Sequence, residues 1–436
     1  MMLVTIIILF FILLVILFIG TPISFGIGFL GVAGILIFLP KSMLSQLCLI
    51  AYSQATSSTT VMIPLFILMA EFLSNSDMAA DLFEVISRRL RRIPANLAIA
   101  SVVASAIFSA VCGSAPATAA TLGRISIPAM LRKGYRPSLV AGTQAAGGNL
   151  GILIPPSINF IMYGLVTETS VVKLFVAGVL PGILIAVMMI LYILIRNKLD
   201  KGMIAPLQDE TPKDYELANK RVGSDLMTVA PVVILIVLIF GILYSGVATA
   251  TESASIGAIG AFVIVLLQRR MTKTCMRKTL LNTTSTSCMI LFLMFGGLIF
   301  AFFLTAINLP QQLSSFIIDA SPNRWVTFII VNIIFLILGC FMDPLSIMLI
   351  VLPFVFPFMT ALGFDPVWLG VIITVNCAVG MITPPVGMNL FVLKGVSNLS
   401  MEQIIRGVVP YVGIFLLAIV IISVFPGIAT WLPNTM

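Results

Sequence analysis

Two proline pairs, in GNLGILIPPSINF at 148–160 and AVGMITPPVGMNLF at 378–391, decide how this chain folds. Each pair lies within an apolar stretch long enough to cross a bilayer, which takes about 20 residues. Proline has no amide hydrogen and clashes with the preceding turn, so two in succession predict a helix that breaks at membrane depth. Such a break is tolerated only where the backbone is buried in protein or lines a wet cavity.

The composition indicates an all-α, polytopic membrane protein. Of the 436 residues, 60% are hydrophobic and only 9% are charged, against roughly 25% charged in an average soluble domain. So little polar surface excludes a soluble enzyme, a disordered chain and a disulfide scaffold. Histidine is absent, which excludes histidine metal sites and proton relays. The net charge of +8 is expected to reflect membrane topology, with no nucleic acid as partner.

Hydropathy predicts the membrane spans. We expect them near 3–20, 22–39, 59–74, 138–164, 174–195, 226–245, 248–268, 280–306, 366–393 and 407–426. Two further apolar stretches, 97–131 and 325–362, are interrupted by small residues and a proline, at 109–120 and 339–346. We expect each to form a re-entrant hairpin, and a double crossing of each stretch would fit the charge pattern equally well. The first span lacks a basic leader region and a cleavage site and is expected to be retained.

Lysine and arginine mark the cytoplasmic side of a membrane. Basic residues flank both sides of the first interrupted stretch, so that hairpin should open to the cytoplasm, whereas the second stretch has few basic flanks and should open to the periplasm. With both termini periplasmic, all but three of the 24 lysines and arginines lie on the cytoplasmic side of the membrane. The three exceptions are Lys41, Lys173 and Arg324. The protein is therefore expected to lie in contact with the lipid bilayer.

The two halves of the chain repeat. The offset is 228 to 229 residues, as from Cys112 to Cys340 and from Pro156 to Pro385. The matches are mostly glycine and proline, which set backbone geometry, so the repeat concerns the fold. Because the two hairpins are expected to open to opposite sides, the repeats are predicted to be inverted.

Each repeat is expected to contain a span, a surface arm, a hairpin, a broken span and a final span. The arms would be 77–93 and 308–324, and apolar residues at helical spacing in the first favour a helix in the membrane interface over a solvated one. The predicted division is 1–58 for N-terminal scaffold spans, 59–196 for repeat 1, 197–279 for a cytoplasmic loop and connecting spans, 280–426 for repeat 2 and 427–436 for a short periplasmic tail.

The broken spans and hairpin tips predict sodium sites. Carbonyl groups freed by a break are hard oxygen ligands that suit Na⁺, and two breaks at equivalent repeat positions favour a site over a mere kink. Some of the serines and threonines are expected only to pack or to bond back to their own helix. The candidate sodium ligands are Ser109, Gly113, Ser114, Gly147, Asn149, Pro155, Gly339, Asp343, Thr374, Asn376, Gly380 and Thr383.

Asp343 is the one acidic residue predicted near mid-membrane, whereas Glu71 and Glu252 are expected to be solvated at span ends. A central carboxylate costs about 2.5–3.5 kcal/mol, so a bound cation would stabilise it. Asp343 is also well placed to cap the helix that Pro344 begins, and the two roles are compatible. Helix N-termini at mid-depth favour an anionic substrate such as a carboxylate. The candidate substrate residues are Ser114, Thr118, Asn159, Asp343 and Asn389.

Three blocks carry a resemblance to a known family: SAVCGSAPATAATLGRISIPAMLRKGY at 109–135, GNLGILIPPSINFIMYG at 148–164 with KLFVAGVLPG at 173–182, and GMITPPVGMNLFVLKG at 380–395. Over nearly its whole length the chain resembles the large membrane subunit of tripartite ATP-independent periplasmic (TRAP) transporters. The resemblance implies an elevator-type secondary transporter of ion-transporter-superfamily architecture in a bacterial inner membrane. It would take up an organic acid, such as sialic acid or a four-carbon dicarboxylate, with sodium.

The same resemblance implies partners and ion positions. A small four-helix membrane subunit, expected as a separate chain, and a periplasmic substrate-binding protein would complete the system. Sodium ions would lie between each hairpin tip and its neighbouring broken helix.

Two other functions are weighed against this one. A self-sufficient sodium/anion symporter would share the inverted-repeat architecture and need no binding protein. An intramembrane enzyme is disfavoured, because the chain has no histidine and one central carboxylate, too few groups for a metalloprotease or an aspartyl dyad.

Overall fold

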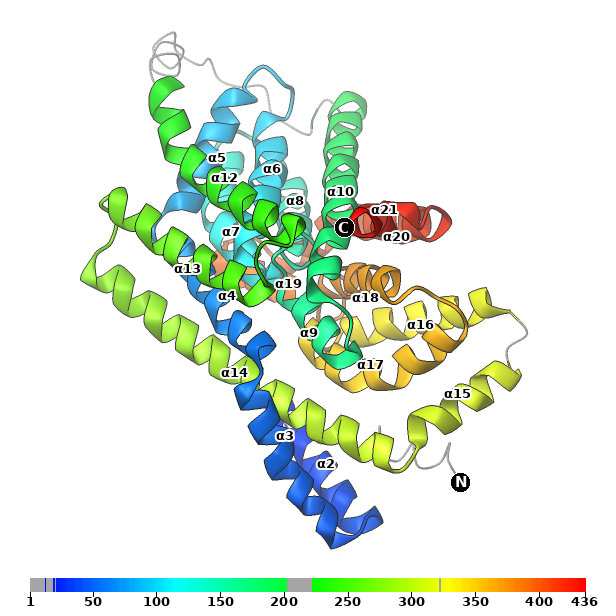
Figure 1. Ribbon diagram of the computed structural model, residues 1–436. Helices are drawn as coiled ribbons and strands as arrows, with labels where there is room; N and C mark the ends of the chain where they lie inside the picture. The colour runs from blue at the N-terminus through cyan, green and yellow to red at the C-terminus, as the bar shows by residue number, and fades with distance from the viewer. Residues whose placement is uncertain (1–11, 13–18, 20, 201, 203–221, 321–322) are drawn as a thin grey trace.

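The computed structural model describes residues 12, 19, 21–200, 202, 222–320 and 323–436. The regular structure of these residues is helical throughout (Figure 1). Within the described part of the chain, five helices are long and apolar enough to span a bilayer, and a bent pair adds a sixth if it forms one span. They are α10 (Val171–Leu199), α13 (Ala250–Leu267), α14 (Lys273–Ala306), α17 (Pro344–Ala361), α20 (Met401–Val424) and the pair Lys41–Thr56 with Ser58–Ser74. The predicted all-α polytopic class is confirmed; the expected span 3–20 lies outside the described residues except for residues 12 and 19.

The N-terminal helices pack along α14. Helix α2 (Ile23–Phe38) approaches α14 closely because Gly31 and Gly34 carry no side chain, and a Cβ at Gly34 would lie 2.6 Å from the ring of Phe303. After η1 (Lys41–Leu44), α3 (Ser45–Thr56) meets α4 (Ser58–Ser74) at a bend of 53°. Sequence analysis placed no helix between 39 and 59; α3 is too polar to register as a span, and it packs against α14.

The remaining helices follow the predicted order of elements in both halves. In the first half they are α4, α5 (Met78–Arg89), α6 (Asn96–Cys112), α7 (Ala115–Arg132), α8 (Pro137–Asn149), η2 (Leu150–Ile152), α9 (Ile158–Thr167) and α10. In the second half they are α14, α15 (Leu309–Ala320), α16 (Arg324–Gly339), α17, α18 (Pro366–Met381), α19 (Met388–Val396) and α20. Helices α12 (Val222–Ser245) and α13 connect the halves, and α21 (Gly427–Thr430) and η3 (Pro433–Thr435) end the chain.

The interruptions lie where the sequence predicted them. Helix α6 ends at Gly113, whose φ of +64° is in the left-handed region that favours glycine. Helix α17 begins at Pro344 after a four-residue break. Both proline pairs lie in non-helical segments, between η2 and α9 and between α18 and α19, and in each the bond joining the two prolines is cis.

The two halves interlock through their broken helices. Helix α8 packs against α20, where a Cβ at Gly142 would lie 2.0 Å from the carbonyl oxygen of Gly407. Beside this crossing, the hydroxyl oxygens of Thr143 and Tyr411 are 2.6 Å apart. In the corresponding way α18 packs against α10, and a Cβ at Gly370 would lie 2.7 Å from Leu174. Each broken helix therefore rests on the final span of the other half.

Each arm helix packs against its own hairpin. The apolar side chains Leu82 and Phe83 of α5 are buried in a cluster with Ala104 and Phe108 of α6, and α15 contacts α17. The apolar face of α5 therefore packs on the protein and is not solvated; its place in the membrane interface stays a prediction. Helical spacing shows that such a face is buried but does not identify its partner.

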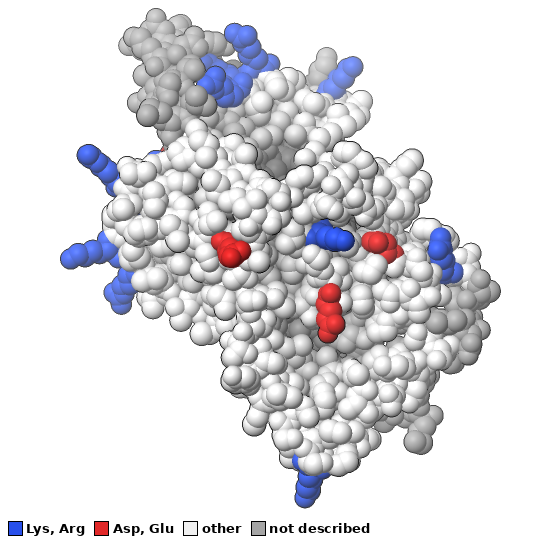
Figure 2. Space-filling view, viewed as in Figure 1, with Lys and Arg blue, Asp and Glu red and all other residues white. Residues whose placement is uncertain are grey.

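The outer surface suits a membrane environment. Figure 2 shows a face on which charged side chains are few and widely spaced, with most lysines and arginines at its periphery. Large apolar side chains such as Phe29, Leu191 and Ile337 are exposed on three different helices. In water so much exposed apolar surface would cause aggregation, whereas in a bilayer it contacts lipid.

Candidate functional site

A cavity of about 480 Å³ lies where the two hairpin tips meet the two broken helices. Residues of the first tip, including Gly113 and Ser114, line it together with Asn159 of α9. The second tip contributes Asp343, and the second broken helix contributes residues on each side of its break. Helices α4 and α14 form the remaining wall. Four segments separated widely in sequence thus converge on one space.

The first tip is bonded to the first broken helix. The amide of Ile158 donates to the carbonyl of Gly113 at 3.3 Å. The hydroxyl of Ser157 donates to the carbonyl of Ile152 at 2.6 Å and accepts from the amide of Phe160, so it bridges the break and caps α9. A Cβ at Gly113 would lie 2.6 Å from the carbonyl oxygen of Pro156, so only glycine fits this tip.

The second tip makes the corresponding contacts. The amide of Gly387 donates to the carbonyl of Cys340 at 3.0 Å. Gly339 and Gly380 approach so closely that a Cβ on Gly380 would lie 2.5 Å from the backbone of Gly339. Both breaks are therefore held to the neighbouring tip by one backbone hydrogen bond and by a glycine contact.

The predicted sodium ligands of the first half fall into two groups: those at buried hydroxyls or beside them, and those that line the cavity or lie in the break. The hydroxyl of Ser109 is buried without a hydrogen-bond partner. A Cβ at Gly147 would lie 2.8 Å from the Oγ of Ser105, another buried hydroxyl without a partner. Hard oxygen atoms without partners beside a bare glycine backbone are a donor set that suits Na⁺. Gly113 and Ser114 line the cavity, and Pro155 is buried in the break.

Asn149 and Asn389 bond to each other instead of lining the cavity. The Nδ2 of Asn389 donates to the Oδ1 of Asn149 at 2.5 Å, and the Nδ2 of Asn149 donates to the carbonyl of Ala378 at 2.5 Å. Both asparagines are fully buried. These bonds join the first broken helix to both parts of the second.

The sodium candidates of the second half include two threonines that bond back to nearby carbonyl groups and two glycines that form a backbone contact. The hydroxyls of Thr374 and Thr383 bond back to the carbonyls of Gly370 and Val379, each four residues earlier, at 2.8 and 2.6 Å. Such bonds use the donor and leave the oxygen lone pairs partly available. Gly339 and Gly380 form the glycine contact between hairpin and broken helix.

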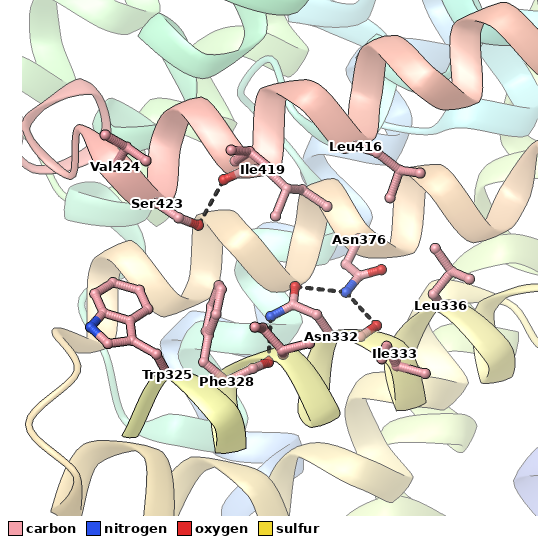
Figure 3. A pocket seen from close by; sticks show the side chains of 12 residues that line it. Trp325, Phe328, Asn332, Ile333, Leu336, Asn376, Leu416, Ile419, Ser423 and Val424 are labelled. Atoms are coloured by element: carbon pink, nitrogen blue, oxygen red, sulfur yellow. Dashed lines mark hydrogen bonds between the residues drawn. The ribbon is translucent and has the colours of Figure 1, made fainter. Parts of the chain in front are cut away.

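Asn376 lines a second, separate cavity of about 540 Å³ between α16, α18 and α20 (Figure 3). Its Nδ2 donates to the carbonyl and to the Oδ1 of Asn332, at 2.8 and 2.9 Å. The structure thus separates Asn376 from the central cavity. The walls around these two amides are mostly apolar side chains, among them Trp325 and Leu416.

Asp343 both caps a helix and faces the central cavity. Its Oδ2 accepts from the amide of Ser346 at 3.1 Å, and its Oδ1 accepts from the Ser346 hydroxyl. Among the candidate substrate residues, Ser114, Asn159 and Asp343 line the cavity, whereas Thr118 is buried behind it and Asn389 pairs with Asn149.

Glu71 of α4 lines the same cavity and was missed by sequence analysis, which expected it to be solvated. It accepts hydrogen bonds at Oε2 from the Nδ2 of Asn75 at 2.8 Å and from the Nδ2 of Asn282 at 2.9 Å. Residues 71 and 75 are one helical turn apart, so the contact between Glu71 and Asn75 could have been predicted from the sequence. Asn282 comes from α14, so no local pattern could reveal it.

Comparison with known proteins identifies the family. A model described as "Tripartite ATP-independent periplasmic transporter, DctM component" matches residues 10–428. The chain belongs to this family. It is 37% identical over 412 residues to the C4-dicarboxylate TRAP transporter large permease protein DctM of Pseudomonas aeruginosa, with 94% of each chain covered. It is 28% identical to the sialic acid TRAP transporter large permease protein SiaM of Vibrio cholerae, with 96% of each covered.

A solved structure shows a related fold. The YdaH transporter of Alcanivorax borkumensis matches with a TM-score of 0.61 and 16% identity, over 89% of this chain and 90% of that one. At this identity the likeness concerns the fold alone. The family assignment confirms that this chain is a multi-pass TRAP transporter subunit and not an enzyme.

Proposed function

We propose that this subunit carries an organic acid together with sodium across the inner membrane, as the transport subunit of a binding-protein-dependent TRAP system. One observation carries the proposal: both hairpin tips and both broken helices line a single cavity of about 480 Å³. A substrate in this cavity would contact every segment that is also suited to hold an ion. Sodium binding and substrate binding would therefore depend on each other.

The cavity has neutral donors for a carboxylate. Among the described residues that line it, none is lysine or arginine. The Nδ2 of Asn159 is buried without a hydrogen-bond partner among the described residues. It lies in the first turn of α9, where the amides of Ile158 and Phe160 already donate to Gly113 and Ser157. The N-terminus of this helix would stabilise an anion through the helix dipole. The substrate carboxylate is therefore proposed to bind beside Asn159.

The coupling ions are proposed to bind behind the tips. In the first half the ligands would come from Ser109, Ser114 and the backbone near Gly147. In the second half they would come from Asp343 and the backbone near Gly339 and Gly380. These positions supply hydroxyl, carboxylate and carbonyl oxygens, the ligands that hard cations prefer.

Transport is proposed to follow an elevator mechanism on an inverted repeat. The hairpins and broken helices would move as one block, because the bond between Asn149 and Asn389 and the close α8–α20 contact hold the two halves together. The wall made by α4 and α14 would stay with the scaffold. One hydrogen bond links Ser74 of this wall to Thr121 of α7, with 3.1 Å between their hydroxyl oxygens.

The system is proposed to need two partners. TRAP systems are tripartite, which implies a periplasmic substrate-binding protein and a small membrane subunit; here the small subunit is proposed to be a separate chain. Both termini of the large subunit are proposed to lie in the periplasm, because this orientation places nearly all lysines and arginines in the cytoplasm.

Uptake by reconstituted vesicles tests the proposal. The large subunit would be inserted with the small subunit, and the binding protein would be supplied outside with a radiolabelled acid that it binds. We expect an inward sodium gradient to drive accumulation and an equal potassium gradient to fail. Equal uptake in potassium-only buffer would contradict sodium coupling. Full uptake by the large subunit alone would instead favour the self-sufficient symporter.

A further inference from the structure

The wall of the central cavity formed by α4 and α14 carries a fixed carboxylate, that of Glu71. Asn75 and Asn282 hold the Oε2 of Glu71 at 2.8 and 2.9 Å, from two different helices. Its other oxygen, Oε1, accepts no hydrogen bond from the described residues, and the side chain lines the cavity. A carboxylate only accepts hydrogen bonds, so this wall offers an oriented acceptor to whatever occupies the space.

The side of the cavity formed by α9, which is proposed to move, carries a hydrogen-bond donor. Within the residues that the structure describes, the Nδ2 of Asn159 has no hydrogen-bond partner, and the residue is 3% exposed. Leaving a buried amide without a partner is costly, so the free Nδ2 indicates a ligand with an acceptor at this end. The cavity thus has a donor on α9 and an acceptor on α4, and a ligand that satisfies both must carry an acceptor group and a separate donor group.

We propose that Glu71 determines substrate selectivity: it favours monocarboxylates that also carry a hydroxyl or ammonium group, and it disfavours a second carboxylate. This inference rests on the proposed function, in which the first carboxylate binds beside Asn159. A hydroxyl or ammonium donates to Glu71 in a charge-assisted hydrogen bond. A second carboxylate would place like charges together with no lysine or arginine among the described lining residues to compensate.

The proposal distinguishes the substrate of this chain from the substrate for which one relative is named. The protein from Pseudomonas aeruginosa is named for C4-dicarboxylates, whereas the one from Vibrio cholerae is named for sialic acid, a monocarboxylate with many hydroxyl groups. Family membership therefore leaves both chemistries open. Glu71 places the present chain with the second kind.

Three small acids that share one carboxylate and differ at the other end provide the test: 4-hydroxybutyrate, 4-aminobutyrate and succinate. Binding to the purified full-length large subunit with its small subunit is measured calorimetrically in sodium chloride. We expect the two donor-ended acids to bind roughly tenfold tighter than succinate or more, the ratio that a charged hydrogen bond gives. Glu71→Gln should bring this ratio close to one.

Matched variants keep the result interpretable. Glu402→Gln changes an exposed carboxylate of α20 that pairs only with Arg406, and should leave the ratio unchanged. Asn159→Leu should weaken all three acids about equally. If Glu71→Gln does not fold, Asn282→Ala, which removes one of the two amides that hold Glu71, should reduce the ratio in part.

Three results would overturn the proposal. They are succinate binding as tightly as 4-hydroxybutyrate, no binding of any of the three acids, and an unchanged ratio in the Glu71 variants. Sodium-driven uptake is measured separately, so its failure would contradict the proposed function without changing this ratio.

Discussion

Replacing Gly380 with alanine tests the contact between the second hairpin and the second broken helix. A Cβ at position 380 would lie 2.5 Å from backbone carbon atoms of Gly339, whereas ordinary contacts begin at 3.4 Å. The two backbones must therefore separate by roughly 0.9 Å. Forced shifts in packed interiors cost about 1–3 kcal/mol. Because a binding site needs its ligands within about 0.5 Å of their proper positions, sodium affinity should fall roughly tenfold or more.

The assay is thermal unfolding of the purified full-length protein in sodium chloride and in equal potassium chloride. An ion that binds only the native state raises the melting temperature, so the wild type should gain stability from sodium and Gly380→Ala should lose most of that gain. Gly413→Ala is the matched control, because nothing lies within 4 Å of its added Cβ and alanine favours a helix by about 1 kcal/mol. An unchanged melting temperature together with an unchanged sodium effect in Gly380→Ala would refute the reasoning.

Three further variants test the proposed ion sites and the proposed moving block. Asn caps a helix as well as Asp does, so Asp343→Asn should keep the melting temperature in potassium but raise the sodium concentration for half-maximal uptake several-fold; an identical sodium titration would remove Asp343 from the site. Ser109→Ala removes a buried hydroxyl without a partner, so it should weaken sodium activation of uptake without lowering stability; a drop in melting temperature alone would indicate a packing role. Oxidising the pair Ser74→Cys with Thr121→Cys, whose native hydroxyl oxygens are 3.1 Å apart, should stop uptake until a reductant is added, while each single variant stays active; uptake through the cross-linked protein would contradict the moving block.

Backbone features were predictable from the sequence because proline and glycine act locally. The proline pairs give the breaks between η2 and α9 and between α18 and α19. Pro344 and the small residues near Gly113 give the two interruptions of the hairpins. The helix α3 was missed because hydropathy detects spans, and this short helix with several polar residues does not qualify.

Side-chain partners could not be predicted in the same way. Asn149 and Asn389 are 240 residues apart and meet only because the two broken helices cross. Asn376 faces a different cavity from Asp343 because of how α18 sits between α16 and α20. Glu71 lies near the end of its helix, where solvation is the natural expectation, and faces the cavity because α14 passes beside α4. Each outcome depends on helix crossings that a single sequence does not specify.

The pairing of the two halves bears directly on coupling. If each repeat held its own ion and substrate independently, one site could fill without affecting the other. Here the amide of Asn389 bonds to Asn149, and Asn149 in turn bonds to the carbonyl of Ala378, so the first broken helix is tied to both segments flanking the second break. A displacement of either tip on ion binding would therefore be passed to the other side of the same cavity. Under the proposed sodium coupling, this interlocking would be a physical route by which a bound ion changes the shape of the substrate site.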